Sequence, residues 1–318
     1  MIASQSLMLI MLKNKLKLAF TLIELLVVIA IIGILSALIV VGMSNATEKA
    51  RIAKSQVFAS SLRNALMSNI VAQYTFDDID SSDYDPTTKV LNNDAGNVPD
   101  SWLSNEGRAY GGPTLKEGND CVSGKCLSFD GTDDYINCGS GSTLNISNFI
   151  TISAWVKYNT TTTPFVVWAN DLYRFAVGSN HSGASTVDSV AFTQTGIQIV
   201  ALSQSSVVVP NMWTYITYTK NGSGATNKLY INGILASLTT NSLYDYSSAG
   251  TNYIGKFAGT QNFSGPIDDV QIYSAAIPIS QIQQNYFAGL NKLFAKNQIN
   301  QIDYQQRLVD LSNNYAKE

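Results

Sequence analysis

The longest apolar run in the chain extends from Phe20 to Met43 and contains one charged residue, Glu24. A helix of this length can cross a bilayer core of ~30 Å. From Ser44 to Ile70 the chain contains neither proline nor glycine, and apolar residues recur at helical spacing. The pattern predicts one continuous helix from Phe20 to about Ile70, apolar in its first half and amphipathic in its second.

Beyond Gln73 the pattern changes to short segments in which apolar and polar residues alternate. Such alternation, interrupted by clusters of Gly, Asn, Asp and Ser, predicts an antiparallel β-sandwich. The strongest local signal is Asn232-Gly233, because this dipeptide favours the two positive φ angles of a type I′ hairpin turn. Residues 79–118 are expected to be mostly loop. The other expected strands are 74–77, 127–129, 135–137, 150–156, 213–218, 228–231, 234–235, 252–256 and 266–273.

Two helical patterns follow the strands. Ser280 is placed to cap a helix from Gln281 to Phe294, and a second helix is expected from Asp303 to Ala316. The predicted fold class is therefore α+β, with a long N-terminal transmembrane and amphipathic helix, an all-β sandwich and a short C-terminal helical segment.

Composition narrows the chemistry. The chain has 20 Lys plus Arg against 23 Asp plus Glu, a net charge of −3, so no nucleic-acid partner is expected. One histidine and three cysteines are too few for an ordinary zinc or iron–sulfur centre. The histidine, His181, lies in a segment rich in Ser, Asn and Gly and is expected at the surface.

Glu24 is unusual, because a carboxylate inside a membrane helix costs ~2.5–3.5 kcal/mol. The segment Ala19-Phe20-Thr21-Leu22-Ile23-Glu24-Leu25-Leu26 resembles the N-terminus of type IV prepilins and pseudopilins, and the likeness extends over about residues 13–60. The resemblance implies that prepilin peptidase cleaves between Ala19 and Phe20 and that the new amine of Phe20 is methylated. It also implies that Glu24 pairs with the N-terminal amine of a neighbouring subunit during assembly.

The N-terminal segment departs from this family in three ways. The residue before the cut is usually glycine and here is Ala19, the leader 1–19 is long with Met11 as a more typical start, and no proline precedes Pro86. The absence of a membrane proline favours a pseudopilin or minor pilin.

The strand region resembles laminin-G-like, concanavalin A-like jelly rolls over about residues 74–288. The motifs that carry the likeness are Leu127–Tyr135, Thr151–Val156, Trp213 with Leu229–Gly233, and Gly265–Tyr273. We therefore expect a leader at 1–19, a membrane and assembly helix at 20–70, a jelly roll at 71–288 and a helical segment at 289–318.

No paired-carboxylate hydrolase site is predicted. A Glu-x-Asp-x-x-Glu pattern does not occur, and adjacent acids such as Asp133 and Asp134 would point to opposite faces of a strand. The chain is therefore predicted not to be an enzyme.

Alternation places Asp268 on the same strand face as Val270 and Ile272, and a carboxylate on an apolar face needs a partner. The jelly-roll resemblance implies calcium, bound by Asp77 and Asp268 where the first and last strands meet. The alternative is that Asp268 accepts backbone hydrogen bonds from a loop. Trp155 is a candidate sugar-stacking residue, with burial in the core as its alternative.

The cysteines allow two disulfide pairings. Cys121 and Cys126 flank a turn-forming Val-Ser-Gly-Lys segment, which favours their pairing and leaves Cys138 free. Cys126 would instead face Cys138 if strands 127–129 and 135–137 form a hairpin centred on Thr132.

Together these features predict a type IV pilin-like filament subunit that is structural and adhesive, anchored in the inner membrane before assembly and then part of an extracytoplasmic filament. The expected partners are other pilin-like subunits, prepilin peptidase, an inner-membrane assembly platform and a glycan or surface protein. Two alternatives remain at this stage: a pseudopilin of a type II secretion or DNA-uptake machine, and a membrane-tethered lectin-like receptor that does not polymerise.

Overall fold

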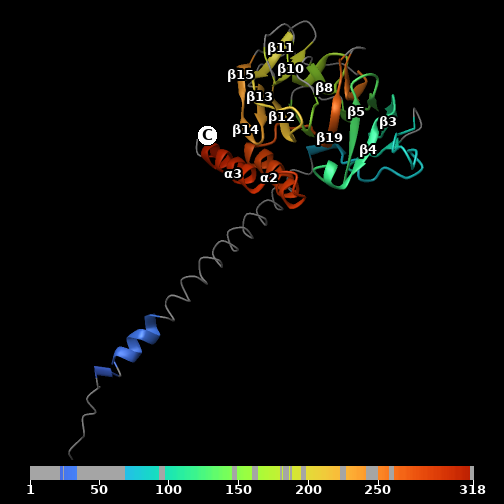
Figure 1. Cartoon of the computed structure of the whole chain (residues 1–318). Coiled ribbons are helices and arrows are strands. Elements are labelled where there is room, and N and C mark those ends of the chain that lie inside the picture. The colour runs from blue at the N-terminus through green and yellow to red at the C-terminus, as the bar shows by residue number, and fades with distance from the viewer. Residues whose placement is uncertain are drawn as a thin grey trace, which may run out of the picture. The chain divides into compact units, whose positions relative to one another are not determined.

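The chain divides into two compact units, residues 1–58 and residues 59–318. The computed structural model describes residues 22–23, 25–33, 69–92, 97–144, 149–159, 164–179, 181, 186, 188–194, 198–222, 227–240, 250–257 and 261–315. In the first unit, residues 22–23 and 25–33 are helical (Figure 1). The rest of the predicted helix 20–70 up to residue 68, with Ala19, Phe20 and Glu24, lies outside the described residues. Within the described residues, no helix has both the length and the apolar character needed to span a bilayer.

The second unit is a sandwich of two antiparallel sheets, as predicted. The first sheet has the strand order β14 (Ile234–Leu235), β13 (Asn227–Ile231), β12 (Thr214–Asn221), β7 (Phe149–Val156), β19 (Ser264–Tyr273), β5 (Lys125–Asp130) and β4 (Thr114–Glu117). The second half of β19 also pairs with β1 (Ile70–Tyr74). The last strand of the domain is thus the partner of the first.

The second sheet has the strand order β15 (Ser237–Thr240), β11 (Gln198–Ser203), β10 (Ser189–Gln194), β9 (Tyr173–Gly178), β8 (Pro164–Ala169), β16 (Asn252–Ile254), β6 (Tyr135–Gly139), β3 (Gly107–Tyr110) and β2 (Asn97–Val98). The short strands β17 (Lys256–Phe257) and β18 (Gln261–Asn262) pair only with each other among the described strands.

The main core lies between the sheets. Alternate residues of β7 enter it, namely Ile150, Ile152, Ala154 and Val156. They pack with aromatic side chains from both sheets, including a closely stacked pair, Phe192 and Tyr218, whose ring centroids are 3.7 Å apart. Alternation along β7 thus sets which residues form the sandwich interior.

Two helices, α2 (Ile279–Ala295) and α3 (Gln301–Tyr315), follow β19 and run side by side (Figure 1). Tyr286, Leu290 and Leu293 of α2 form a second apolar cluster with Trp155 and other residues on the outer face of the first sheet. This outer face is therefore covered, which explains why β7 is buried on both sides.

The turn at Asn232-Gly233 is confirmed, with φ angles of 52° and 77°. Other local predictions were wrong. Ile70 begins β1 instead of ending the long helix. Ser280 lies inside α2, whose N-cap is Pro278, and Pro278 makes no side-chain cap bond. Helix α2 also continues across the expected domain boundary at 288–289.

The predicted hairpin of 127–129 with 135–137 was also wrong. The two segments lie in β5 and β6, which belong to different sheets. Their connecting turn at 130–134 therefore crosses from one sheet of the sandwich to the other.

Candidate functional site

Asp268 lies on the outer face of the first sheet, because β19 carries a bulge between Asp268 and Gln271. In the register before the bulge, Asp268 pairs with Trp155, and directly paired residues of antiparallel strands share a face. Asp269 supplies the irregular conformation, with a left-handed φ of 46°. The prediction that Asp268 shares a face with Val270 is therefore wrong, since an extra residue shifts the alternation.

The Asp268 carboxyl is fully buried, with 0% of its surface exposed. The backbone N–H of Ser123 donates to its Oδ2 at 2.9 Å, so the predicted alternative of a loop hydrogen bond is present. Its Oδ1 has no hydrogen-bond partner among the described residues. Burial, with the charges of Asp269 and Asp77 nearby, raises the pKa of this carboxyl well above its usual range.

Asp77 lies beside the same loop. The backbone N–H of Lys125 donates to Asp77 Oδ1 at 2.6 Å. A Cβ on Gly124 would come within 2.1 Å of that oxygen, so only glycine fits there. Phe76, just before Asp77, has a left-handed φ of 62°. Phe76 precedes Asp77 and Asp269 follows Asp268, and left-handed φ angles at such non-glycine residues are backbone strain that surrounding contacts must maintain.

The loop that supplies these N–H groups is closed by a disulfide between Cys121 and Cys126, whose Cα atoms are 5.5 Å apart. We call residues 121–126 the disulfide loop. Cys138 is a buried free thiol on β6, in the other sheet from Cys126, so the alternative pairing does not form. The sequence reasoning missed Ser123 and Lys125 as hydrogen-bond donors to the carboxylates, and Gly124 as the residue that leaves room for Asp77, although the flanking cysteines marked the loop.

The disulfide loop is also fastened to α2 and the turn after it. Lys292 Nζ donates to Ser123 Oγ at 2.7 Å, and Lys296 Nζ donates to the carbonyl of Cys121 at 3.0 Å. Gln298 Nε2 donates to the same carbonyl at 2.6 Å. The loop therefore links Asp77 and Asp268 to α2 and the turn after it.

The donor chemistry at Asp268 fits a hard cation. A buried carboxylate oxygen without a hydrogen-bond donor among the described residues is available, and the carboxylate of Asp77 lies near enough to raise the pKa of Asp268. Carboxylate and carbonyl oxygens are the ligands that calcium takes in proteins. Asp268, with Asp77, would hold the ion.

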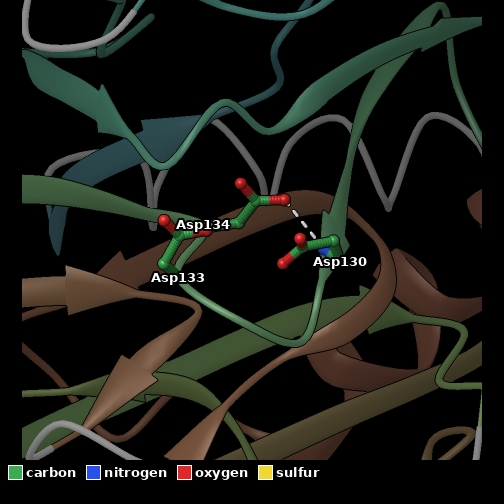
Figure 2. Close-up of side chains that lie close together, drawn as sticks. All are labelled: Asp130, Asp133 and Asp134. Atoms are coloured by element: carbon green, nitrogen blue, oxygen red, sulfur yellow. Dashed lines mark hydrogen bonds between the residues drawn. The ribbon is translucent and has the colours of Figure 1, made fainter.

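A second acidic group lies in the turn that crosses between the sheets (Figure 2). Carboxylate oxygens of Asp130, Asp133 and Asp134 lie within 4.8 Å of one another. The N–H of Asp130 donates to Asp134 Oδ2 at 2.8 Å, and the N–H of Thr132 donates to Asp130 Oδ1 at 2.7 Å. Burial, followed by the charges of Asp130 and Asp133, raises the pKa of Asp134 to about 6. The expectation that Asp133 and Asp134 point apart was wrong, because both lie in a turn.

Trp155 is 2% exposed, so the prediction of an open sugar-stacking platform is contradicted and its alternative, burial, holds. Its ring stacks on Tyr286, with centroids 5.6 Å apart, and packs against Tyr215. The backbone of Gly289 lies so close that a Cβ there would come within 2.4 Å of the ring. Helix α2 therefore covers Trp155.

His181 is buried, contrary to the surface position expected. Its Nε2 lies 3.2 Å from the carbonyl of Ser189. Burial lowers its pKa to about 4, so the ring is neutral at pH 7.

Several solved structures are similar to this chain at low sequence identity. Domain 4 of AbnA, a GH43 extracellular arabinanase from Geobacillus stearothermophilus solved in complex with arabinotriose, is 20% identical with a TM-score of 0.48, and the match covers 68% of this chain and 97% of that chain. The binding domain of Paraclostridial Mosquitocidal Protein 1 is 15% identical with a TM-score of 0.48, over 71% of this chain and 53% of that one. A Trypanosoma rangeli sialidase mutant displaying trans-sialidase activity is 10% identical with a TM-score of 0.48, over 71% and 34%.

No curated protein matches the chain. Two protein families do match it. Residues 14–40 match the prokaryotic N-terminal methylation motif, and residues 130–283 match the concanavalin A-like lectin/glucanases superfamily. Both resemblances found in the sequence are thereby confirmed.

Proposed function

We propose that this chain is a type IV pilin-like filament subunit that displays its jelly roll outside the cytoplasm as an adhesive module. One observation carries the proposal: a methylation motif of pilin type at 14–40 and a lectin-type domain at 130–283 occur in the same chain. The motif supports processing between Ala19 and Phe20 and assembly with other pilin-like subunits. The domain supports recognition of a glycan or a surface protein.

A pseudopilin of a secretion or DNA-uptake machine is the second candidate. The absence of any proline before Pro86 favours it, because major pilins commonly carry a proline within the membrane helix. In that case the jelly roll would contact components of the machine and not a surface.

The proposal includes a calcium ion held by Asp77 and Asp268 and a binding role without catalysis. The unpartnered Oδ1 of Asp268 supports the ion. The lack of a Glu-x-Asp-x-x-Glu pattern supports the absence of glycoside hydrolysis. Calcium would fix the disulfide loop against the sheet by neutralising carboxylates that otherwise repel one another.

The test is to image cells whose chain carries a label on the sandwich. Wild-type chain is expected in labelled surface filaments. Glu24→Ala chain is expected to remain in the membrane, because the variant lacks the carboxylate that pairs with a neighbour's amine. Glu48→Ala is the matched control in the same predicted helix and is expected to assemble. Label at the cell surface without filaments would contradict the proposal and favour the tethered receptor. Short filaments that depend on secretion components would favour the pseudopilin.

A further inference from the structure

A cavity of about 240 Å³ lies between α2 and the outer face of the first sheet. On the helix side it is lined by Gln281, Asn285, Ala288 and Lys292, which recur along one face of α2. Between Gln281 and Lys292 the helix rises by ~16 Å. The sheet side is lined by β1 and β19, with Gln73 and Gln271 directly paired across the two strands. We call this cavity the α2 groove.

Gln281 lines the α2 groove and is 4% exposed, and its Oε1 has no hydrogen-bond partner in the described part of the chain. Buried polar atoms in folded proteins almost always have a partner. Protein atoms cover this oxygen, so a ligand in the groove would pair with it after a rotation of the Gln281 side chain.

The other polar side chains of the groove are held in place by a network. Tyr273 OH donates to Gln271 Oε1 at 2.8 Å, and Asn285 Nδ2 donates to the same oxygen at 3.3 Å. Gln281 Nε2 donates to Asn285 Oδ1 at 2.8 Å. The amide groups present both donors and acceptors, which suits hydroxyl groups, since each hydroxyl donates once and accepts twice.

Size and charge narrow the ligand further. A cavity of ~150 Å³ holds a benzene ring, so the α2 groove has room for a six-membered ring with hydroxyl substituents. Of the described residues that line the groove, Asp77 and Asp269 carry carboxylates and Lys292 carries an ammonium group, which already donates to Ser123. Two carboxylates against one ammonium disfavour an anionic ligand.

We propose that the α2 groove binds one pyranose ring of a neutral glycan. The proposal deepens the adhesive function proposed above and rests on it for its biological meaning. In this arrangement α2 forms one wall of the site and Asn285 and Gln271 recognise hydroxyl groups. Asp77 is shared between the groove and the proposed calcium site, so the disulfide loop borders both.

The test is saturation-transfer NMR and titration on the full mature chain in detergent, with D-glucose, D-galactose, D-mannose and N-acetyl-D-glucosamine as neutral probes and N-acetylneuraminic acid as the anionic probe. At least one neutral sugar is expected to bind saturably and more tightly than the anionic sugar. Asn285→Ala is expected to weaken binding at least tenfold. Ala288→Trp, at an exposed position on the groove, is expected to abolish it.

Two matched variants control for changes in the helices. Asn313→Ala removes an exposed amide from α3, and Ala295→Trp adds the same ring at the exposed end of α2; both should bind as wild type. Unchanged circular dichroism of Ala288→Trp keeps that variant informative. Binding by none of the neutral sugars, preference for the anionic sugar, or full binding by Ala288→Trp would each overturn the groove as the site.

The two proposals fail separately. Glycan binding that persists in Ala288→Trp leaves adhesion possible and rejects the groove. Loss of sugar binding in Ala288→Trp together with an absence of labelled filaments supports the groove and rejects the filament function.

Discussion

The sandwich carries two acidic groups that differ in their surroundings. Asp130, Asp133 and Asp134 lie in one turn, and the N–H groups of that turn bond two of them. Asp77 and Asp268 come from opposite ends of the domain sequence and both accept N–H groups of the disulfide loop, and Asp268 keeps one buried oxygen without a donor among the described residues. Clustered carboxylates and a buried oxygen without a donor thus mark different acidic groups of the domain. An unsatisfied buried oxygen is a better indicator than proximity alone.

The largest predicted change is in calcium-dependent stability when a carboxylate charge is removed from one of the two acidic groups. Calcium at about 100 times its Kd stabilises the native state by ~2.7 kcal/mol, which raises the Tm of a domain of this size by ~5–10 °C. Asp268→Asn should abolish this increment, and Asp133→Asn should keep it. Thermal melts in calcium and in chelator measure both. An increment that survives Asp268→Asn but disappears in Asp133→Asn would place the ion at the turn.

Removing the disulfide of the disulfide loop is expected to lower both the Tm and the calcium affinity. Closing a loop of this size is worth ~2 kcal/mol in the chain-entropy model, so Cys121→Ser with Cys126→Ser should lower the Tm by ~4–8 °C. The loop also supplies the N–H groups to Asp77 and Asp268, so the double variant should bind calcium more weakly. A reducing agent should reproduce the loss in wild type and leave the double variant unchanged. Equal calcium affinity in the two proteins would disconnect the loop from the ion.

Measuring stability against pH distinguishes the two acidic groups further. The pKa of Asp134 is raised to about 6, so the folded state binds its proton more tightly than the unfolded state and stability falls as pH rises from ~4 to ~6. His181, with a pKa lowered to about 4, contributes the opposite slope up to ~6.5. Measuring Asp134→Asn against wild type cancels the histidine, and the variant should gain in relative Tm from pH 4 to pH 7. A difference independent of pH would contradict the raised pKa.

Asp268 should respond to calcium in this series, while Asp134 should not. Without calcium, the raised pKa of Asp268 also makes the stability of the wild-type protein fall as pH rises. Relative to wild type, Asp268→Asn should therefore be more stable at pH 7 than at pH 4. With saturating calcium at pH 7, the ordering should reverse, because the wild-type carboxylate then holds the ion. The same ordering with and without calcium would show that the two acidic groups behave alike.

The sequence was most informative where structure depends on neighbours along the chain. Asn232-Gly233 specifies its turn because both residues tolerate positive φ, and the alternation along 150–156 marks the residues of β7 that enter the core. The cysteines at 121 and 126 could be paired because few residues separate them.

The sequence was least informative where distant segments meet. Strands β5 and β6 are joined by a short turn but belong to different sheets, which the turn residues do not specify. The bulge at Asp269 reverses the face of Asp268, and a non-glycine residue with positive φ gives no local warning. Covering of Trp155 depends on Gly289, more than a hundred residues away in the chain, whose missing side chain allows α2 to approach the ring.

The same contrast applies to the α2 groove. Gln281, Asn285 and Lys292 fall on one helical face, a pattern typical of a solvent-facing stripe. Only the packing of α2 over β1 and β19 turns that stripe into the wall of a cavity. The ligand chemistry therefore emerges from tertiary structure and not from any motif.

The central claim is that a pilin-type N-terminus assembles the chain into filaments that carry the sandwich. Mass spectrometry of the N-terminal peptide of chain purified from shed filaments tests this claim most directly. The mature chain is expected to begin at Phe20 with a methylated amine, after cleavage that follows Ala19. A mature chain that retains residues before Phe20, or that begins at an unmodified residue further along, would contradict it.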